Sequence, residues 1–166
     1  SLIVTEKATN KLTTYRVRHD GGIDAPLVTA SVGATPFGFA VDHRGTLLVS
    51  EAFGGAPGAS ALSSYSFAHN DPVMPIVVSP SVGTTQSAAC WVVVTPNGRY
   101  AYTTNTASNT ISLYGVMGNG QVALRNAVTT STDAGPIDAA ITPRGRQLFV
   151  LNGGGRSIHL NGGGGR

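Results

Sequence analysis

Apolar and polar residues alternate in short stretches along the chain, and turns rich in glycine separate these stretches. Alternation with a period of two is typical of a half-buried β-strand, because successive side chains of a strand point to opposite faces of its sheet. The longest apolar run, residues 88–94, ends at Thr95-Pro96-Asn97-Gly98 and is much shorter than the ~18 residues that a membrane helix requires. The pattern therefore predicts an all-β chain without a membrane-spanning helix.

A strand–turn–strand unit occurs three times, at residues 39–49, 92–102 and 139–149. Each unit has an apolar strand, a turn that ends in glycine, and a second strand rich in β-forming residues. The turn glycines, which supply the positive φ that such turns need, are 53 and 47 residues apart, and they are Gly45, Gly98 and Gly145. A period of about fifty residues is the length of one four-stranded blade of a β-propeller.

A second repeated element has the same period. Three tyrosines lie 50 and 49 residues apart, and each is expected in the third strand of a blade: Tyr15, Tyr65 and Tyr114. Short fourth strands are expected around residues 27–30, 76–79 and 122–125. A β-sandwich also has regularly spaced turns, but it does not require the same strand–turn–strand sequence every fifty residues. The fold predicted is a propeller of four-stranded antiparallel blades.

The period divides the chain into a partial blade at 1–34, complete blades at 35–86 and 87–134, and a partial blade with a glycine-rich tail at 135–166. Closed rings usually have four to eight blades, so the prediction is an open part of a ring. Open blade edges favour self-association. Residues 157–161 begin like a third strand and are followed by four glycines and Arg166, which we interpret as a truncated or altered end; a flexible natural tail is the alternative.

Several segments resemble known propellers. Residues 102–112 resemble the "YVTN" repeat of bacterial propellers, and residues 135–138, 142–146 and 148–152 are similar to the seven-bladed lactonase family. That family groups 6-phosphogluconolactonase-like and carboxymuconate-cyclase-like proteins, and the resemblance extends to about Ser157. It implies about half of a seven-bladed ring, whose complete form hydrolyses or forms a sugar or small-acid lactone. Because a fold does not define a reaction, a non-catalytic binding or scaffold propeller, or a fragment without independent activity, remains an alternative.

The loops after second strands and the segments before first strands are expected to gather on one face of a propeller. Lactone hydrolysis needs a base that activates water and donors that stabilise the oxyanion. We expect Glu51 and Glu6 to be the catalytic residues; the loop after Glu51 is five residues longer than its equivalents. The residues expected to bind substrate are Asn105, Asn152, Asp138, Arg156, Phe37 and Trp91. The structural alternative is that the Glu and Asn residues satisfy turn backbone groups and that Trp91 packs between blades.

Composition limits the partners and cofactors. The net charge is +3 and the pI about 9.4, but the Lys and Arg residues are scattered singly, so no nucleic-acid partner is expected. Cys90 is the only cysteine, which excludes intramolecular disulfides, and no histidine is expected on the presumed binding face. No cofactor is expected; a Ca²⁺ or Mg²⁺ site is an alternative, with hard oxygen ligands from Glu6, Glu51, Asn105, Asn152 and Asp138. The chain is expected to be soluble, either in the bacterial cytoplasm or secreted.

Overall fold

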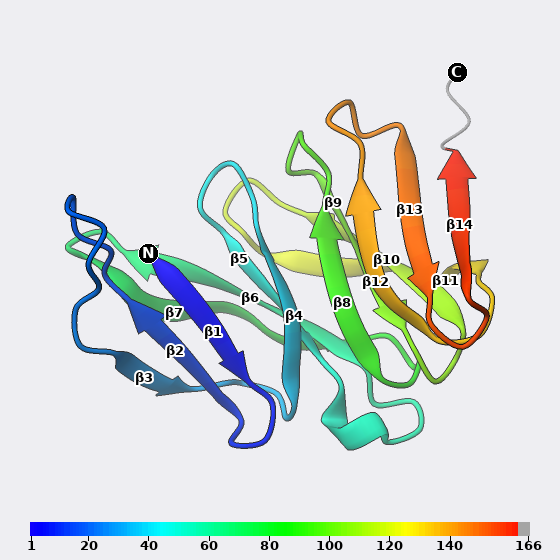
Figure 1. Cartoon of the computed structure of the whole chain (residues 1–166), viewed down its shortest axis with the longest axis horizontal. Coiled ribbons are helices and arrows are strands. Elements are labelled where there is room, and N and C mark those ends of the chain that lie inside the picture. Colours follow the sequence, from blue (N-terminus) through cyan, green and yellow to red (C-terminus); the bar gives the residue numbers. More distant parts are fainter. Residues whose placement is uncertain (163–166) are drawn as a thin grey trace.

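The computed structural model describes residues 1–162, and the side chains of residues 1–160 (Figure 1). Its strands are connected by short loops, one of which contains a 3₁₀ turn, η1 (Phe53–Gly55). The strands of the first two sheets are β1 (Leu2–Glu6), β2 (Lys11–Tyr15), β3 (Leu27–Ala30), β4 (Pro36–Val41), β5 (Leu47–Glu51), β6 (Ala61–Ala68) and β7 (Asp71–Gly83). Those of the other two are β8 (Ala89–Val94), β9 (Tyr100–Asn105), β10 (Thr110–Val116), β11 (Val122–Ser131), β12 (Pro136–Ile141), β13 (Gln147–Asn152) and β14 (Ser157–Gly162).

Each sheet is an antiparallel meander in which consecutive strands are neighbours. The two middle sheets have four strands each, β4 to β7 and β8 to β11, and the two outer sheets have three, β1 to β3 and β12 to β14. We refer to these sheets as blades one to four. The repeated turns connect β4 to β5, β8 to β9 and β12 to β13, and their glycines have φ values of +85°, +63° and +67°. The predicted fold class, antiparallel propeller blades forming part of a ring, is confirmed.

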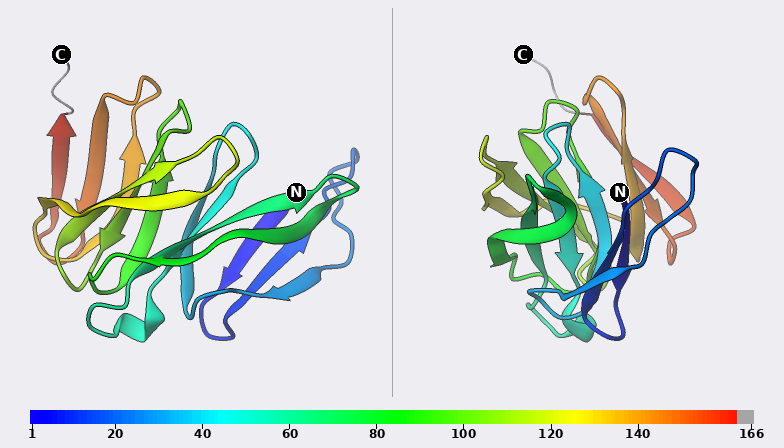
Figure 2. Two further views of the ribbon diagram at one scale, coloured as in Figure 1. Left: turned by 180° about the vertical axis from the view of Figure 1, so that it is seen from behind. Right: turned by 90° about the vertical axis from the view of Figure 1, so that its left-hand side faces the viewer.

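The blades lie side by side with equivalent strands next to one another. Strands β1, β4, β8 and β12 lie along the face viewed in Figure 1, and β4 and β12 both contact β8. From behind, the long strands β7 and β11 cross the opposite side of the molecule (Figure 2). The first strands of complete blades are therefore the inner strands, and the fourth strands are the outer ones.

Apolar side chains between the blades form the core. Leu47, Val49 and Tyr65 of blade two pack against Leu12 of blade one. Leu48 and Leu62, on the other face of blade two, pack against residues of blade three. Each fully buried leucine contributes roughly 1.5–3 kcal/mol to folding, so contacts between blades are a main source of stability.

The fourth strands differ from the expectation. Strand β3 has the expected bounds, but β7 has 13 residues and β11 has 10, because both pair with the whole third strand across register shifts. Strand β7 contains Pro72, Pro75 and Pro80, which are tolerated on an outer strand whose free edge needs no backbone donor. The glycine-rich tail expected at the end of the chain lies mostly at residues 163–166, outside the described residues.

Candidate functional site

Three equivalent backbone contacts join the loop after each second strand to the segment before the first strand of the same blade. Ala52 N donates to Thr35 O at 3.0 Å, and the next blade repeats the contact between Thr106 N and Ala88 O at 2.9 Å. In blade four Gly153 N donates to Gly135 O at 2.7 Å. The loops and entering segments that the sequence singles out therefore lie together at one end of each blade.

Glu51, at the end of β5, is completely buried. One carboxyl oxygen accepts hydrogen bonds from Gly33 N at 2.9 Å and Ser63 Oγ at 2.5 Å, and the other accepts one from Ser81 Oγ at 2.6 Å. These donors come from the connection between blades and from strands β6 and β7. The carboxyl group thus cross-links three segments and has no contact with solvent.

Glu6 occupies the equivalent position at the end of β1 but is partly exposed. Its carboxylate accepts hydrogen bonds from the hydroxyls of Thr13 and Thr9, the latter at 2.6 Å. The hydrogen bond from Thr13, and secondly that from Thr9, lower the pKa of Glu6 because both favour the charged form. Glu6 is therefore an ionised carboxylate within reach of water at neutral pH.

Asn105 and Asn152 occupy the same position in blades three and four, and both are completely buried. Asn105 Nδ2 donates to Ser112 Oγ at 2.8 Å and Thr110 Oγ1 at 3.1 Å, and Asn152 Nδ2 donates to Ser157 Oγ at 3.3 Å. In all four blades, the polar residue that ends the second strand bonds to a hydroxyl on the third strand or the turn that leads to it. Within the described structure, the Oδ1 atoms of both asparagines have no hydrogen-bond donor.

The other expected site residues are more accessible. Asp138 and Arg156 are exposed, and one Asp138 oxygen accepts a hydrogen bond from Ala139 N at 2.7 Å. Phe37 and Trp91 are half-buried, and Lys7 Nζ lies 4.9 Å from the centre of the Phe37 ring. Asp138, Glu6 and Glu51 belong to three different blades, and within the described residues they do not form a group of three acidic side chains that could share a metal ion.

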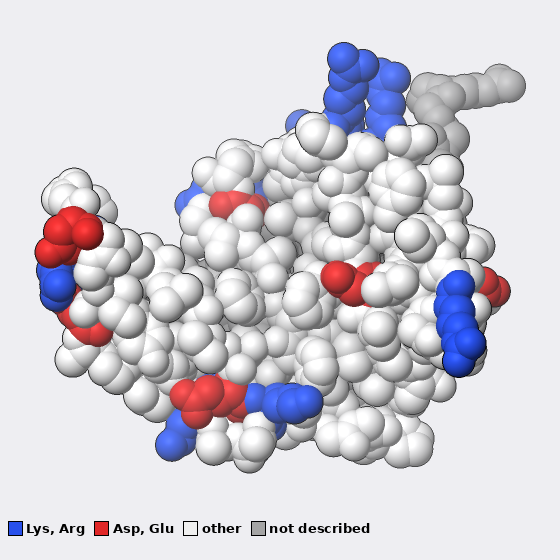
Figure 3. Space-filling view, viewed as in Figure 1, with Lys and Arg blue, Asp and Glu red and all other residues white. Residues whose placement is uncertain are grey.

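The face along the inner strands is mostly uncharged. Figure 3 shows it with charged side chains mainly around its rim and few in its central part. Within the described part of the chain, no three His, Cys, Asp or Glu side chains lie close enough together to hold a metal ion. Three of the oxygen ligands considered for a divalent cation are instead completely buried and have hydrogen-bond partners inside the protein: Glu51, Asn105 and Asn152.

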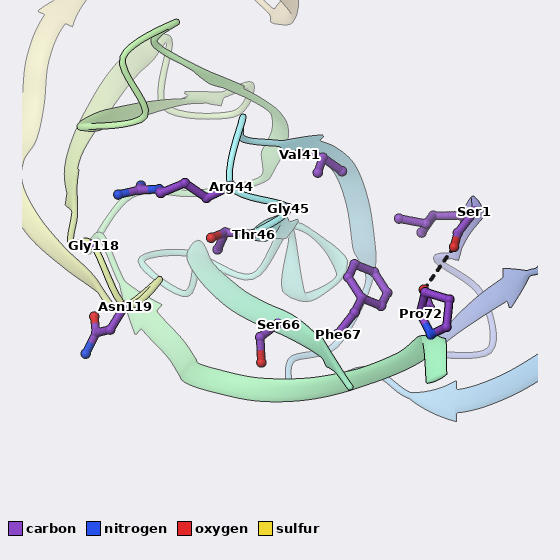
Figure 4. A pocket seen from close by; sticks show the side chains of 11 residues that line it. Ser1, Val41, Arg44, Gly45, Thr46, Ser66, Phe67, Pro72, Gly118 and Asn119 are labelled. Atoms are coloured by element: carbon purple, nitrogen blue, oxygen red, sulfur yellow. Dashed lines mark hydrogen bonds between the residues drawn. The ribbon is translucent and has the colours of Figure 1, made fainter. Parts of the chain in front are cut away.

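A cavity of about 470 Å³ lies beside the β4–β5 turn, at the opposite end of the blades from the expected site (Figure 4). Val41, Phe67 and Pro72 lie on one side of it, and Arg44, Thr46 and Asn119 on the other. The wall is mixed: apolar side chains face a cation, hydroxyls and an amide.

The charged group of this cavity is held in place by its own turn. Arg44 contacts Asp42 through Nε at 2.9 Å and Nη2 at 2.7 Å, and Nη2 also donates to Gly98 O of the next blade at 2.6 Å. Burial opposes ionisation of Asp42, but hydrogen bonds from Thr46 N and Arg44 outweigh it, and the pKa of Asp42 is lowered. We did not predict this pair from the sequence; an Asp two residues before an Arg in the turn was the available signal.

The fold and the repeat define the class: a propeller made of four-stranded antiparallel blades. The family model described as "Lactonase, 7-bladed beta-propeller" matches residues 69–160, more than half of the chain. The chain belongs to this family, as its sequence resemblance implies. No curated protein sequence matches the chain significantly.

Solved structures share the fold at low sequence identity. A candidate 6-phosphogluconolactonase from Bacteroides uniformis ATCC 8492 has a TM-score of 0.72 and 21% identity over 95% of this chain and 47% of its own. A protein of unknown function from Desulfotomaculum acetoxidans DSM 771 has a TM-score of 0.75 and 15% identity, over 96% and 50%. The periplasmic gluconolactonase PpgL of Pseudomonas aeruginosa has a TM-score of 0.65 and 17% identity, over 85% and 43%. The chain spans about half the length of these structures.

Within residues 1–162, no helix has the length and apolar character of a membrane span.

Proposed function

We propose that the chain contributes blades to a lactonase-like propeller whose complete form hydrolyses or forms a sugar or small-acid lactone. The observation that carries this proposal is the family match over residues 69–160. Solved structures named as a gluconolactonase and a candidate 6-phosphogluconolactonase support the same substrate class.

The exposure of the carboxylates decides which of them the proposal uses. Glu51 contacts three donors and no solvent, so we assign it the role of fixing the loop and the connection between blades. Glu6 and Asp138 reach solvent, and Glu6, whose pKa lies below the ordinary value of a glutamate, is ionised at neutral pH. In hydrolysis, one of these carboxylates takes a proton from water as the water oxygen attacks the lactone carbonyl carbon. The ring C–O bond then breaks, and the leaving oxygen receives the proton that the carboxyl group took from water, which returns this group to its charged form.

The remaining residues supply binding and charge stabilisation in this proposal. Arg156 is exposed and can donate to a developing oxyanion, and the half-buried Phe37 and Trp91 can contact the apolar face of a sugar ring. Asn105 and Asn152 are completely buried by their own blades, so we assign them to the support of these loops rather than to direct contact with substrate.

The test is the rate of acid release from glucono-1,5-lactone by the protein in its complete ring form. Glu6→Gln and Asp138→Asn are compared with the exposed control Asp20→Asn, which lies in a hairpin of blade one. Loss of the general base is expected to lower kcat by about 10²–10⁴-fold with a smaller change in KM. If both variants keep the wild-type kcat, neither carboxylate is the base.

A non-catalytic propeller is the second candidate, and one observation favours it. Three of the four equivalent strand-end residues, Glu51, Asn105 and Asn152, are completely buried and form hydrogen bonds inside the protein. A wild-type ring that accelerates hydrolysis of neither gluconolactone nor its 6-phosphate, but binds either one in calorimetry, would support this binding role.

A further inference from the structure

The first strands of blades two, three and four are irregular at the same place, next to their first residues, where their register with the second strands shifts. A shift of this kind, a β-bulge, leaves backbone groups outside the regular ladder and redirects the side chains beside it. In blades two and three the irregular segments carry Phe37 and Trp91, the two aromatic residues of the candidate site. The direction of both side chains therefore depends on the contacts that hold the backbone of these segments.

Ser50 of β5 contacts both segments and is completely buried. Its hydroxyl oxygen accepts a hydrogen bond from Gly38 N at 3.0 Å. The same hydroxyl lies 3.1 Å from Gly38 O and 3.2 Å from Cys90 O, so its single proton can be donated to either carbonyl. Gly38 directly follows Phe37, and Cys90 directly precedes Trp91. One side chain thus connects the two backbone segments that carry the aromatic residues.

The two segments also approach each other closely at Gly38. A Cβ at this position would lie 2.7 Å from Cys90 O and 3.0 Å from Cε3 of the Trp91 ring, much closer than an ordinary contact. The indole ring therefore packs directly against the backbone of β4, and β4 and β8 lie side by side (Figure 1). Trp91 and Phe37 are nevertheless only half-buried, so part of each side chain is accessible to a ligand.

The neighbouring blades have a hydroxyl at the same position of their second strands, and it bonds to the same two segments. Thr5 Oγ1 donates to Phe37 O at 2.6 Å, and Thr104 Oγ1 accepts a hydrogen bond from Trp91 N at 3.1 Å. Thr5, Ser50 and Thr104 each come directly before the polar residue that ends the second strand. The repeat therefore places a hydroxyl beside each irregular segment, and threonine fits this position as well as serine does.

From these contacts we propose that Ser50 is a positioning residue, which fixes Phe37 and Trp91 relative to each other so that they form one apolar wall for the ring of the lactone. The lactone as ligand rests on the proposed function, whereas the placement of the two side chains does not. Aromatic side chains of this kind bind the apolar face of a ring by burying it. Because Ser50 is completely buried, it acts through the two segments that it joins and does not touch the ligand.

Quenching of Trp91 fluorescence by acrylamide tests the placement directly, because Trp91 is the only tryptophan of the chain. Ser50→Ala should raise the quenching constant of the folded chain about 2-fold or more, since a lost hydrogen bond makes local opening several times more frequent. Ser50→Thr, which introduces the residue that blades one and three have, should keep the wild-type value. Ser64→Ala is the matched control: Ser64 is also completely buried in blade two, but its hydroxyl has no hydrogen-bond partner in the described structure. Equal quenching constants for the wild type and Ser50→Ala would overturn the proposal.

The kinetics of the protein in its complete ring form separate positioning from proton transfer. For glucono-1,5-lactone, Ser50→Ala should raise KM about 5–10-fold and leave kcat within about 2-fold, because the wall binds the ring equally before and in the transition state. Ser50→Thr should restore the wild-type KM. An unchanged KM for Ser50→Ala, or a loss that falls on kcat as it does for Glu6→Gln, would overturn the proposal.

Two outcomes need a second measurement. If Ser50→Ala does not fold, Ser50→Cys replaces it, because a thiol nearly keeps the volume but forms much weaker hydrogen bonds. If the wild-type ring hydrolyses no lactone, the proposed function fails, and the quenching of Trp91 in the Ser50 variants alone decides the positioning role.

Discussion

Removal of the buried carboxyl group of Glu51 is expected to destabilise the fold substantially. In Glu51→Ala, Ser63 and Ser81 lose their acceptor but can rotate their hydroxyls, whereas the backbone N–H of Gly33 is fixed and stays buried. An orphaned buried donor costs about 1–3 kcal/mol, and the cavity left by the side chain adds about 1 kcal/mol. The free energy of unfolding should therefore fall by about 2–4 kcal/mol.

The assay is urea unfolding of the purified chain, followed by the fluorescence of Trp91, its only tryptophan. Glu51→Gln, which keeps one acceptor oxygen and the volume, should lose less than Glu51→Ala. Glu6→Ala is the matched control at the equivalent, partly exposed position, and its loss should be the smallest of the three. A Glu51→Ala midpoint equal to that of the wild type, with an unchanged slope, would refute a structural role for this carboxyl group.

Three further measurements test other parts of the structure. A Cβ on Gly33 would lie 2.1 Å from Glu51 Oε2, so Gly33→Ala should lower the urea midpoint. Gly118→Ala is the control and should not lower it, because no atom lies within 4 Å of a Cβ placed there. Equal midpoints for the two variants would argue against the close contact of Gly33 with Glu51. Ala88 has φ +58°, so Ala88→Gly should raise the free energy of unfolding by about 0.5 kcal/mol, because the relief of backbone strain exceeds the entropy cost of glycine. Ala107→Gly, the control, should lower the free energy of unfolding. A lower free energy of unfolding for Ala88→Gly would contradict the left-handed backbone at this position. Because the pKa of Asp42 is lowered in the folded state, the unfolded state binds a proton at this side chain more readily. The contribution of Asp42 to the free energy of unfolding is therefore complete above about pH 4 and is lost as the pH falls through the folded-state pKa. Urea midpoints between pH 5 and 2.5 should therefore fall less steeply for Asp42→Asn than for the wild type, and identical slopes would contradict the Asp42–Arg44 pairing.

Much of the fold could be predicted from the sequence because the repeat is local. Gly45, Gly98 and Gly145 mark turns that require positive φ, and the alternation on either side of each turn defines two strands of known direction. The tyrosines of the third strands then fix the period of the blade. The lengths of β7 and β11 could not be predicted, because an outer strand with prolines and register shifts is defined by its pairing partner and has no strict alternation of its own.

The candidate site was less predictable than the fold. The sequence singled out Glu6, Glu51, Asn105 and Asn152 as site residues, and the structure places all four at the ends of second strands. Their exposure depends on partners elsewhere in the chain: Ser81 and Gly33 enclose Glu51, whereas Glu6 keeps contact with solvent. The pair of Asp42 with Arg44 and its bond to Gly98 of the next blade likewise depend on how two blades pack.

The sequence by itself determined the all-β class and the blade period, because turn chemistry and side-chain alternation act over a few residues and recur about every fifty residues. Only the tertiary structure decided which face of each strand is covered. Leu47 and Leu2 have the same residue type and repeat position, yet one is completely buried and the other is 45% exposed. The physical reason is that burial depends on whether a neighbouring blade removes the side chain from water, and residue type alone does not determine this.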